Sequence, residues 1–308
     1  MLNKKKILSG VYGLAIGDAL GVPVEFNSRE DLQRNPVTGM RAGGTHNQPK
    51  GVWSDDTSMV LATMEAMSRN NWGASTIMYN FSRWLYNAEF TATGNVFDVG
   101  NTTAKAIQRY RLGELPENWG GTDIRDNGNG SLMRMLPLIY YVCDKGRGIH
   151  PGDTNFIEAV SSLTHAHYIS KQSCVTYVYT GVYIMRYGSS MGLRTAIKYA
   201  LKDLWAYYKE GYSYLDRLKC SEKYIKSSGY VVDSLEASLW CLYNTISYRE
   251  AVLKAVNLGG DTDTIGAITG SLAGLYYGFD SIPKEWINTL RNKKLINNIC
   301  DKFHDKYK

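Results

Sequence analysis

The sequence has few of the features that mark secreted, membrane or fibrous proteins. Among its 308 residues there are only seven prolines and five cysteines. No stretch approaches the ~18 uninterrupted apolar residues of a membrane span, and the N-terminal segment lacks the apolar core of a signal peptide. We therefore expect a cytoplasmic protein that has no association with a membrane.

The cysteines carry no recognisable metal or disulfide pattern. Their number is odd and none lies within four residues of another, so neither a zinc knuckle nor a paired disulfide framework is predicted. We expect free thiols at Cys143, Cys174, Cys220, Cys241 and Cys300.

Charge is present in both signs and is spread along the chain. With 35 Lys and Arg against 29 Asp and Glu, the formal net charge is +6. Apart from Lys4–Lys6 and Lys293–Lys294, the basic residues are interspersed with acids. Because a nucleic-acid-binding surface needs basic residues gathered into a stripe, we do not expect a nucleic-acid partner.

The sequence does have a strong helical periodicity. Apolar residues recur every three to four positions, as at Ile7, Val11 and Leu14, with scarcely any alternation of period two. No linker or internal repeat divides the chain, so we predict one compact all-α domain over residues 1–308. Further helices are predicted near residues 59–67, 77–85, 102–112, 130–143, 154–164, 170–187, 192–209, 233–244, 249–257, 263–276 and 284–304.

The first group of residues that points to chemistry is an acidic pair at a predicted helix start. Ser54, Asp55 and Asp56 precede an apolar helical pattern. Helix capping alone explains one acid here, because Ser and Asp are preferred N-caps. A second adjacent carboxylate adds like-charge repulsion unless a cation offsets it, so we favour a metal site over a cap.

A second acidic pair stands at another predicted helix start. Asp261, Asp263 and Thr264 follow two glycines and precede the apolar helix of residues 265–275. Carboxylate and hydroxyl oxygens suit Mg²⁺ or Mn²⁺ better than Zn²⁺, for which the chain offers no matching His and Cys set. Together the two acidic pairs suggest the halves of a two-metal site.

A third group is rich in glycine and amides. It comprises Asp98–Thr103 and Asp126–Arg134. Glycine-rich loops that enter helices can cradle a phosphate through backbone N–H groups, and Ser131 and Arg134 would reinforce such a cradle. A plain turn with a capped helix is an equally good interpretation of these segments alone. His165 and His167 lie two residues apart, which places them on different helix faces and argues against a shared metal.

Taken together, these segments resemble the ADP-ribosylglycohydrolase family. The resemblance spans roughly residues 7–290 and implies an all-α array of helices in one domain, with two metal ions, Mg²⁺ or Mn²⁺, at its centre. It also implies hydrolysis of the glycosidic bond between ADP-ribose and a protein side chain, most typically arginine. The matching motifs are Gly13–Gly21, Pro23–Phe26, Ser54–Thr57, Asp98–Gly100, Gly128–Gly130, Thr164–His165 and Gly260–Thr264.

The resemblance also assigns expected roles to individual residues. Glu25 would be a gating or acid/base carboxylate beside the metals, and the catalytic proton donor would be Glu25, Asp55, Asp98 or a water held by the metals. Asp98 would also contact the ribose or the modified side chain. The expected metal ligands are Ser54, Asp55, Asp56, Asp261, Asp263 and Thr264, and the expected ADP-ribose pocket comprises Asp98, Gly100, Asn129, Gly130, Ser131 and His165.

The sequence departs from the family pattern at two positions. Ser54 stands where the family often has Thr, and its hydroxyl supplies the same oxygen ligand. Tyr168 stands where proline is frequent, which leaves the local loop shape open.

We expect a monomer that acts on an ADP-ribosylated protein and yields ADP-ribose. Hydrolysis of another ADP-ribose linkage (to serine, a nucleic acid or a small metabolite) and ADP-ribose binding without turnover are the alternatives.

Overall fold

The computed structural model describes residues 2–144, 151–208 and 213–308, and within these ranges every regular element is a helix. The prediction of an all-α protein is therefore confirmed. The α-helices are α1 (Lys4–Gly21), α2 (Arg29–Arg34), α3 (Asp55–Met67), α4 (Ala74–Asn87), α5 (Asn101–Arg111), α6 (Leu136–Asp144), α7 (Pro151–Ser162), α8 (Tyr168–Met191), α9 (Leu193–Tyr207), α10 (Tyr214–Arg217), α11 (Val231–Tyr243), α12 (Tyr248–Val256), α13 (Thr262–Tyr277), α14 (Lys284–Thr289) and α15 (Lys293–Tyr307).

Short 3-10 helices connect several of these elements, and three isolated β-bridges join Gly43 to Gln48, Gly121 to His165 and Gly128 to Tyr230. The 3-10 helices are η1 (Val22–Val24), η2 (Pro116–Asn118), η3 (Ile124–Asp126), η4 (Asn129–Arg134), η5 (Glu222–Tyr224) and η6 (Phe279–Ser281).

The prediction of two continuous helices is wrong, because each of them is interrupted in the structure. The predicted helix 284–304 is broken into α14 and α15, because Leu290 is extended (ψ 131°) and Asn292 is left-handed (φ 39°). The predicted helix 130–143 is divided into η4 and α6, because Pro137 has no N–H to continue a helix from the preceding turn. The short helices α2 and α10 fall in stretches where the sequence predicts no helix.

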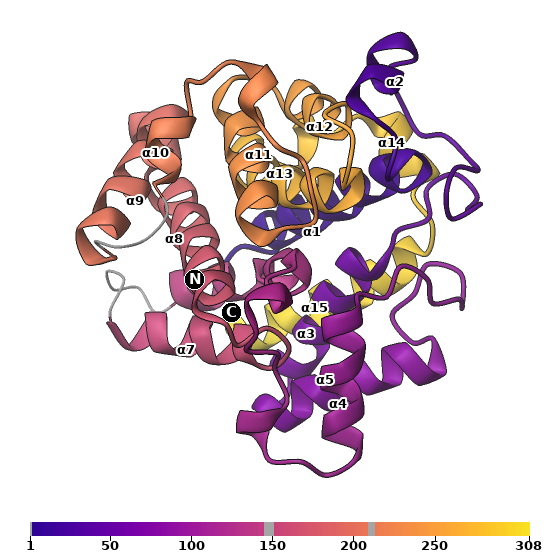
Figure 1. Cartoon of the computed structure of the whole chain (residues 1–308), viewed down its shortest axis with the longest axis vertical. Coiled ribbons are helices and arrows are strands. Elements are labelled where there is room, and N and C mark those ends of the chain that lie inside the picture. Colours follow the sequence, from indigo (N-terminus) through magenta and orange to yellow (C-terminus); the bar gives the residue numbers. More distant parts are fainter. Residues whose placement is uncertain (1, 145–150, 209–212) are drawn as a thin grey trace.

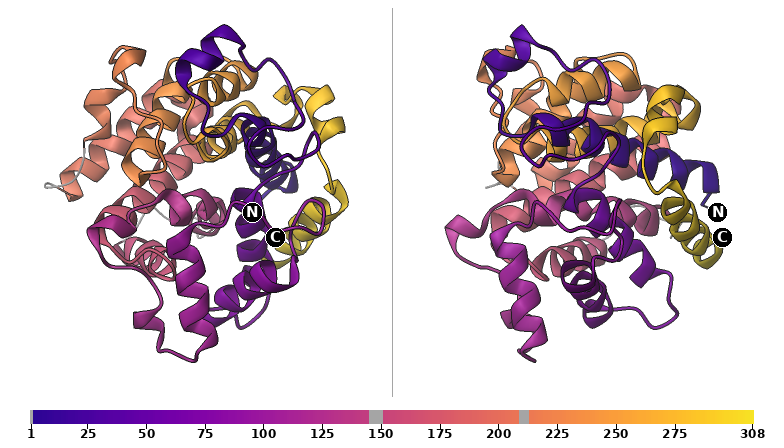
Figure 2. Two further views of the ribbon diagram at one scale, coloured as in Figure 1. Left: turned by 45° about the vertical axis from the view of Figure 1, so that its right-hand side comes forward. Right: turned by 90° about the vertical axis from the view of Figure 1, so that its right-hand side faces the viewer.

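The helices gather on two sides of α1. Figures 1 and 2 show α9 to α13 on one side of it and α4 and α5 on the other. Helix α1 packs along α13 and also contacts α3 and α15. Lys4 Nζ lies 2.6 Å from Asp301 Oδ1, so the first and last helices meet.

The contact between α1 and α13 depends on glycines that face each other. A Cβ placed on Gly13, Gly17 or Gly21 would overlap backbone atoms of α13, and one placed on Gly266 or Gly270 would overlap backbone atoms of α1. The contacts run antiparallel, since higher residue numbers in α1 meet lower ones in α13. This close approach, which only glycine permits, brings the C-terminal end of α1 against the start of α13.

Helix α1 is apolar because it is surrounded by protein. The stretch Lys4–Val24 is long and apolar enough to cross a membrane, since an 18-residue window within it has a mean hydropathy of 1.5. However, 94% of that 18-residue window is buried inside the protein. A helix that is apolar all round is expected in the core of a protein of this size. The core position therefore accounts for its composition.

Candidate active site

Asp18 holds the start of α3 in place from within α1. Its Oδ1 accepts a hydrogen bond from the Ser54 backbone N–H (2.9 Å), and its Oδ2 accepts bonds from the backbone N–H (3.1 Å) and the hydroxyl (2.6 Å) of Thr57. Ser54 caps α3, accepting from the Asp56 N–H through Oγ and donating to Asp56 Oδ2 at 3.0 Å. The capping interpretation and the acidic cluster therefore coexist at this helix start.

The start of α13 is fixed by contacts with distant loops. Gly260 has a left-handed backbone (φ 73°), and its carbonyl accepts from Phe26 N–H (2.8 Å) while its N–H donates to Asn27 O (2.9 Å). The Asp261 N–H donates to Ser227 O (2.8 Å). These bonds place Glu25, which precedes Phe26, beside the acidic residues of α13.

The two helix starts bring Asp56 of the first acidic pair and both members of the second into two adjoining carboxylate clusters, whereas Asp55 is in neither. Carboxylate oxygens of Asp18, Asp56 and Asp263 lie within 4.8 Å of one another, and so do those of Glu25, Asp261 and Asp263. Thr264 Oγ1 donates to Asp56 Oδ2 (3.3 Å) and so connects the two helix starts.

Three carboxylates of the cluster share one pattern of hydrogen bonding. One oxygen of each is held by the protein: Asp56 by Ser54 and Thr264, Asp261 by Asn129 Nδ2 (2.8 Å), and Asp263 by the Thr264 N–H (2.9 Å). The other oxygen of each (Asp56 Oδ1, Asp261 Oδ1 and Asp263 Oδ2) is buried and has no hydrogen-bond partner. Burying a carboxylate oxygen without a partner costs free energy unless a cation lies beside it.

The charges of the cluster also favour a bound cation. Burial, followed by repulsion from neighbouring carboxylates, raises the pKa values of Asp55, Asp56 and Asp263 well above their usual range. No carboxylate of the cluster forms an ion pair with Lys or Arg within the described ranges. The donors are hard oxygens, so the residues fit divalent Mg²⁺ or Mn²⁺.

Glu25 and Asp98 share a histidine at the edge of the acidic cluster. His46 Nε2 hydrogen-bonds Glu25 Oε2 and lies 4.0 Å from Asp98 Oδ1. Burial, then repulsion from Asp98, Asp261 and Asp18, raises the pKa of Glu25 to about 9. Burial also raises the pKa of Asp98, an effect that the nearby His46 opposes.

The glycine- and amide-rich segment lies next to the acidic cluster. Asn129 Nδ2 donates to Asp261 Oδ2 and to Ser234 Oγ (2.9 Å), and a Cβ placed on Gly130 would lie 3.0 Å from His165 Cε1. Gly100, two residues after Asp98, is the N-cap residue of α5. The structure therefore brings Asn129 and Gly130 close to His165 and to the start of α13.

Ser131 and Arg134 are placed differently from the expected phosphate cradle. The Ser131 hydroxyl is buried and bonds Ser161 Oγ (3.1 Å) and Cys174 Sγ (3.4 Å). Arg134 is completely buried and stacks on Phe81, with the guanidinium carbon 4.9 Å from the ring centre. The expectation that the Arg134 side chain reaches a phosphate is therefore wrong, because the side chain has no exposed surface.

Arg134 instead acts on His165 through Thr164. Arg134 Nη2 donates to Thr164 Oγ1 (2.9 Å), which lies 2.9 Å from His165 Nδ1. Burial, then the charge of Arg134, lowers the pKa of His165 to about 3. His165 is therefore neutral, with Nδ1 held by the Thr164 hydroxyl and Nε2 beside the Gly128–Gly130 loop.

The second histidine is a structural residue at the start of α8. His167 is its N-cap, and Nδ1 accepts from the Ile169 N–H (3.3 Å) and contacts Asn127 Nδ2 (2.9 Å). Tyr168 occupies the first position of α8, which proline also suits. The replacement therefore leaves the helix start intact, which settles the loop shape that the sequence left open.

Four residues of the site have no role predicted from the sequence, although two of them lie within the matching motifs: Asp18, His46, and the aromatic residues Phe26 and Phe97, whose rings lie near His46. Asp18 had a signal, because it is the one acid of α1 and follows a largely apolar stretch. His46 had a weaker one, its position in the polar, glycine-rich loop of residues 43–48.

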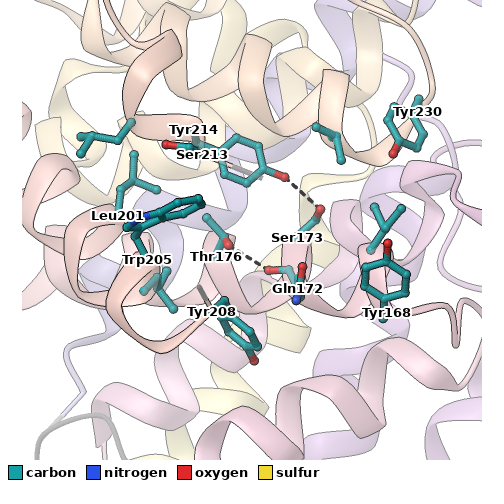
Figure 3. A pocket seen from close by; sticks show the side chains of 14 residues that line it. Tyr168, Gln172, Ser173, Thr176, Leu201, Trp205, Tyr208, Ser213, Tyr214 and Tyr230 are labelled. Atoms are coloured by element: carbon teal, nitrogen blue, oxygen red, sulfur yellow. Dashed lines mark hydrogen bonds between the residues drawn. The ribbon is translucent and has the colours of Figure 1, made fainter. Parts of the chain in front are cut away.

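A separate cavity of about 340 Å³ lies between α8, α9 and the start of α11. Figure 3 shows Tyr168 and Tyr230 on one side of it and Leu201 and Trp205 on the other. No charged side chain lines it among the described residues. It is therefore chemically distinct from the acidic site, although Tyr230 follows the 227–229 loop that contacts Asp261 and Asn129.

Comparisons with known proteins agree with this geometry. The chain is 32% identical over 308 residues to ADP-ribosylarginine hydrolase Tri1 of Serratia proteamaculans, covering 97% of this chain and 78% of that protein. It is 30% identical over 295 residues to ADP-ribosyl-[dinitrogen reductase] glycohydrolase of Rhodospirillum rubrum, covering 94% and 91%.

A solved structure described as an ADP-ribosylglycohydrolase-related protein complex superposes with a TM-score of 0.79 at 26% identity and covers 99% of both chains. The sequence profile of the ADP-ribosylglycohydrolases matches residues 2–308. This chain therefore belongs to the ADP-ribosylglycohydrolase family.

Proposed function

We propose that this protein hydrolyses the bond between ADP-ribose and the arginine side chain of a modified protein, and that it does so with two Mg²⁺ or Mn²⁺ ions. The arginine linkage is supported by relatives at 31–32% identity that are ADP-ribosylarginine hydrolases. The chemistry is supported above all by one structural observation, the three buried carboxylate oxygens of Asp56, Asp261 and Asp263 that have no partner.

Six residues at the two helix starts would hold the ions. When bound, the ions would supply electrostatic stabilisation of the substrate and water oxygens. The proposed ligands are Ser54, Asp55, Asp56, Asp261, Asp263 and Thr264, of which all but the partly buried Asp261 are buried.

Glu25 is the proposed source of the proton for the leaving group. Cleavage of a glycosidic bond develops oxocarbenium character on the ribose, and the leaving nitrogen needs a proton. In the metal-free protein, burial and repulsion from neighbouring carboxylates raise the pKa of Glu25 to about 9, which favours a carboxyl that holds a proton. His46 Nε2 orients this carboxyl through Oε2.

Asp98, Asn129 and His165 are the proposed contacts to ADP-ribose. Asp98 has a left-handed backbone (φ 55°) and sits at the edge of the cluster, where its carboxylate can accept from a hydroxyl or a guanidinium group. His165 is neutral, and its Nε2 lies beside the Gly128–Gly130 loop, where it could hydrogen-bond the ribose or the diphosphate. These three side chains would orient the glycosidic carbon beside Glu25.

The test is the release of ADP-ribose from two peptides, one modified on arginine and one on serine. Each is incubated with Mg²⁺, with Mn²⁺ and with a chelator. We expect release from the arginine peptide only, and its loss in the chelator. Release from the serine peptide alone would move the proposal to that linkage, and binding of ADP-ribose without any release would show a non-catalytic relative.

A further inference from the structure

Phe26 occupies a position that core packing does not explain. Its side chain is 66% exposed, and its backbone is left-handed (φ 64°), a conformation that is strained for a residue with a bulky side chain. The Phe26 N–H bond to Gly260 O and the bond of Thr45 Oγ1 to Glu25 O (2.8 Å) hold this conformation. Such strain is maintained only where the surrounding structure enforces it, and it clusters at functional sites.

Phe26 belongs to a group of three rings at the edge of the acidic cluster. The centre of the His46 ring lies 6.3 Å from that of Phe26 and 5.1 Å from that of Phe97. The same His46 contacts Glu25 and lies 4.0 Å from Asp98. Aromatic faces and carboxylates therefore lie together beside the acidic residues of α13.

This combination suits one kind of acceptor group. A guanidinium is a planar, delocalised cation that stacks on aromatic faces and pairs with carboxylates through two N–H donors. Asp98 has no ion pair with Lys or Arg in the described part of the chain, so a guanidinium placed beside it would meet no competing Lys or Arg. A neutral serine side chain would use neither the ring faces nor the charge.

We propose that Phe26, His46 and Phe97, together with Asp98, form the subsite that receives the guanidinium group of the modified arginine. The inference rests on the proposed function and deepens it, since it names the residues that select the acceptor. Phe26 supplies the most exposed ring face of the group. The contact of this ring with the guanidinium would stabilise the bound substrate and the transition state by the same amount.

The experiment compares Phe26→Leu, which keeps the bulk of the side chain and removes the aromatic face, with Phe26→Tyr, which keeps the face. Tyr199→Leu on α9 is the matched control, because Tyr199 is also an exposed aromatic residue (52%). Each metal-loaded protein is assayed for KM and kcat on the arginine-modified peptide and for the affinity of free ADP-ribose by calorimetry.

We expect Phe26→Leu to raise KM about 2- to 30-fold, the size of a cation–π contact, with kcat and ADP-ribose affinity unchanged. Phe26→Tyr and Tyr199→Leu should behave as wild type. A wild-type KM for Phe26→Leu would overturn the inference. So would a parallel loss of peptide and ADP-ribose affinity, because that result indicates a distorted pocket.

Failure of the proposed function gives a different result. If the wild type releases no ADP-ribose, calorimetric binding of the same arginine-modified peptide still reports on Phe26. Weaker peptide binding by Phe26→Leu, with ADP-ribose binding intact, would then support the subsite in a protein without turnover. Equal peptide binding by the two proteins would reject it.

Discussion

Thr264 Oγ1 lies 3.3 Å from Asp56 Oδ2, although 208 residues separate the two in the chain. This hydrogen bond joins the start of α13 to the start of α3. Because each helix start carries its own acidic pair, the contact assembles one carboxylate cluster from two local motifs. Repulsion within that cluster should therefore lower the stability of the metal-free protein.

Asp263→Asn tests this repulsion. The Asp263 carboxylate is completely buried, with Glu25, Asp56, Asp261 and Asp98 nearby. Removing its charge should raise the melting temperature in the presence of a chelator, by about 2 °C for each kcal/mol of relieved repulsion. The same variant should lose activity and most of the stabilisation by Mg²⁺ that wild type shows. Calorimetric melting with chelator and with Mg²⁺ measures both effects, and a lower melting temperature in chelator would contradict the prediction.

The stability of the metal-free protein should fall as pH rises. The pKa values of Asp18 and Glu25 are raised to about 7 and about 9 in the folded protein, mainly by burial, whereas unfolded carboxyls titrate near 4. Between these values the folded state binds more protons than the unfolded state, so the free energy of unfolding decreases with pH, by at most about 1.4 kcal/mol per pH unit for each group. Denaturant unfolding in chelator at pH 5, 7 and 9 measures this slope.

Glu25→Gln provides the control for the pH dependence. The variant should show a shallower slope between pH 5 and 9, and saturating Mg²⁺ should reduce or reverse the slope of wild type. A metal-free protein that grows more stable across this range would show that the carboxyls are ionised when folded.

The helices and the acidic pairs were predictable because their signals are local. Asp55 and Asp56 directly follow the helix cap Ser54, and Asp261 and Asp263 follow two glycines that end a loop. Each motif can be read within a few residues. That these motifs face each other could be inferred from the family resemblance, but the physical reason lies in the glycine contacts between α1 and α13.

The remaining parts of the site depend on contacts between distant segments. His46 reaches Glu25 because Thr45 bonds the Glu25 carbonyl and Gly43 pairs with Gln48. Nothing within the 43–48 loop specifies those partners. The error on Arg134 has a similar origin: a sequence shows the charge of a side chain but not whether the helices around it leave the charge any access to solvent.

Gly270→Ala should strongly destabilise the protein. A Cβ at this position would overlap the backbone carbonyl of Gly13, and backbone atoms cannot move aside without separating α1 from α13. We expect a loss of about 3 kcal/mol or more, or failure to fold. Gly39→Ala is the control, since a Cβ there meets only Trp286 Nε1 at an ordinary 3.6 Å. Equal melting temperatures for the two variants would show that the helices do not need this close approach.

Thr164→Val should weaken ADP-ribose binding although Thr164 is completely buried. The valine removes the hydroxyl that accepts from Arg134 and hydrogen-bonds His165 Nδ1. Without it the His165 ring loses the hydrogen bond that holds its orientation, and Arg134 loses a partner in a buried site. We expect about a 5-fold lower affinity for ADP-ribose, the size of one hydrogen bond, together with a loss of about 1–3 kcal/mol in stability. Thr164→Ser keeps the hydroxyl and should restore both quantities, as measured by calorimetry and denaturant unfolding. If Thr164→Val binds ADP-ribose as tightly as wild type, the hydroxyl does not set the orientation of His165.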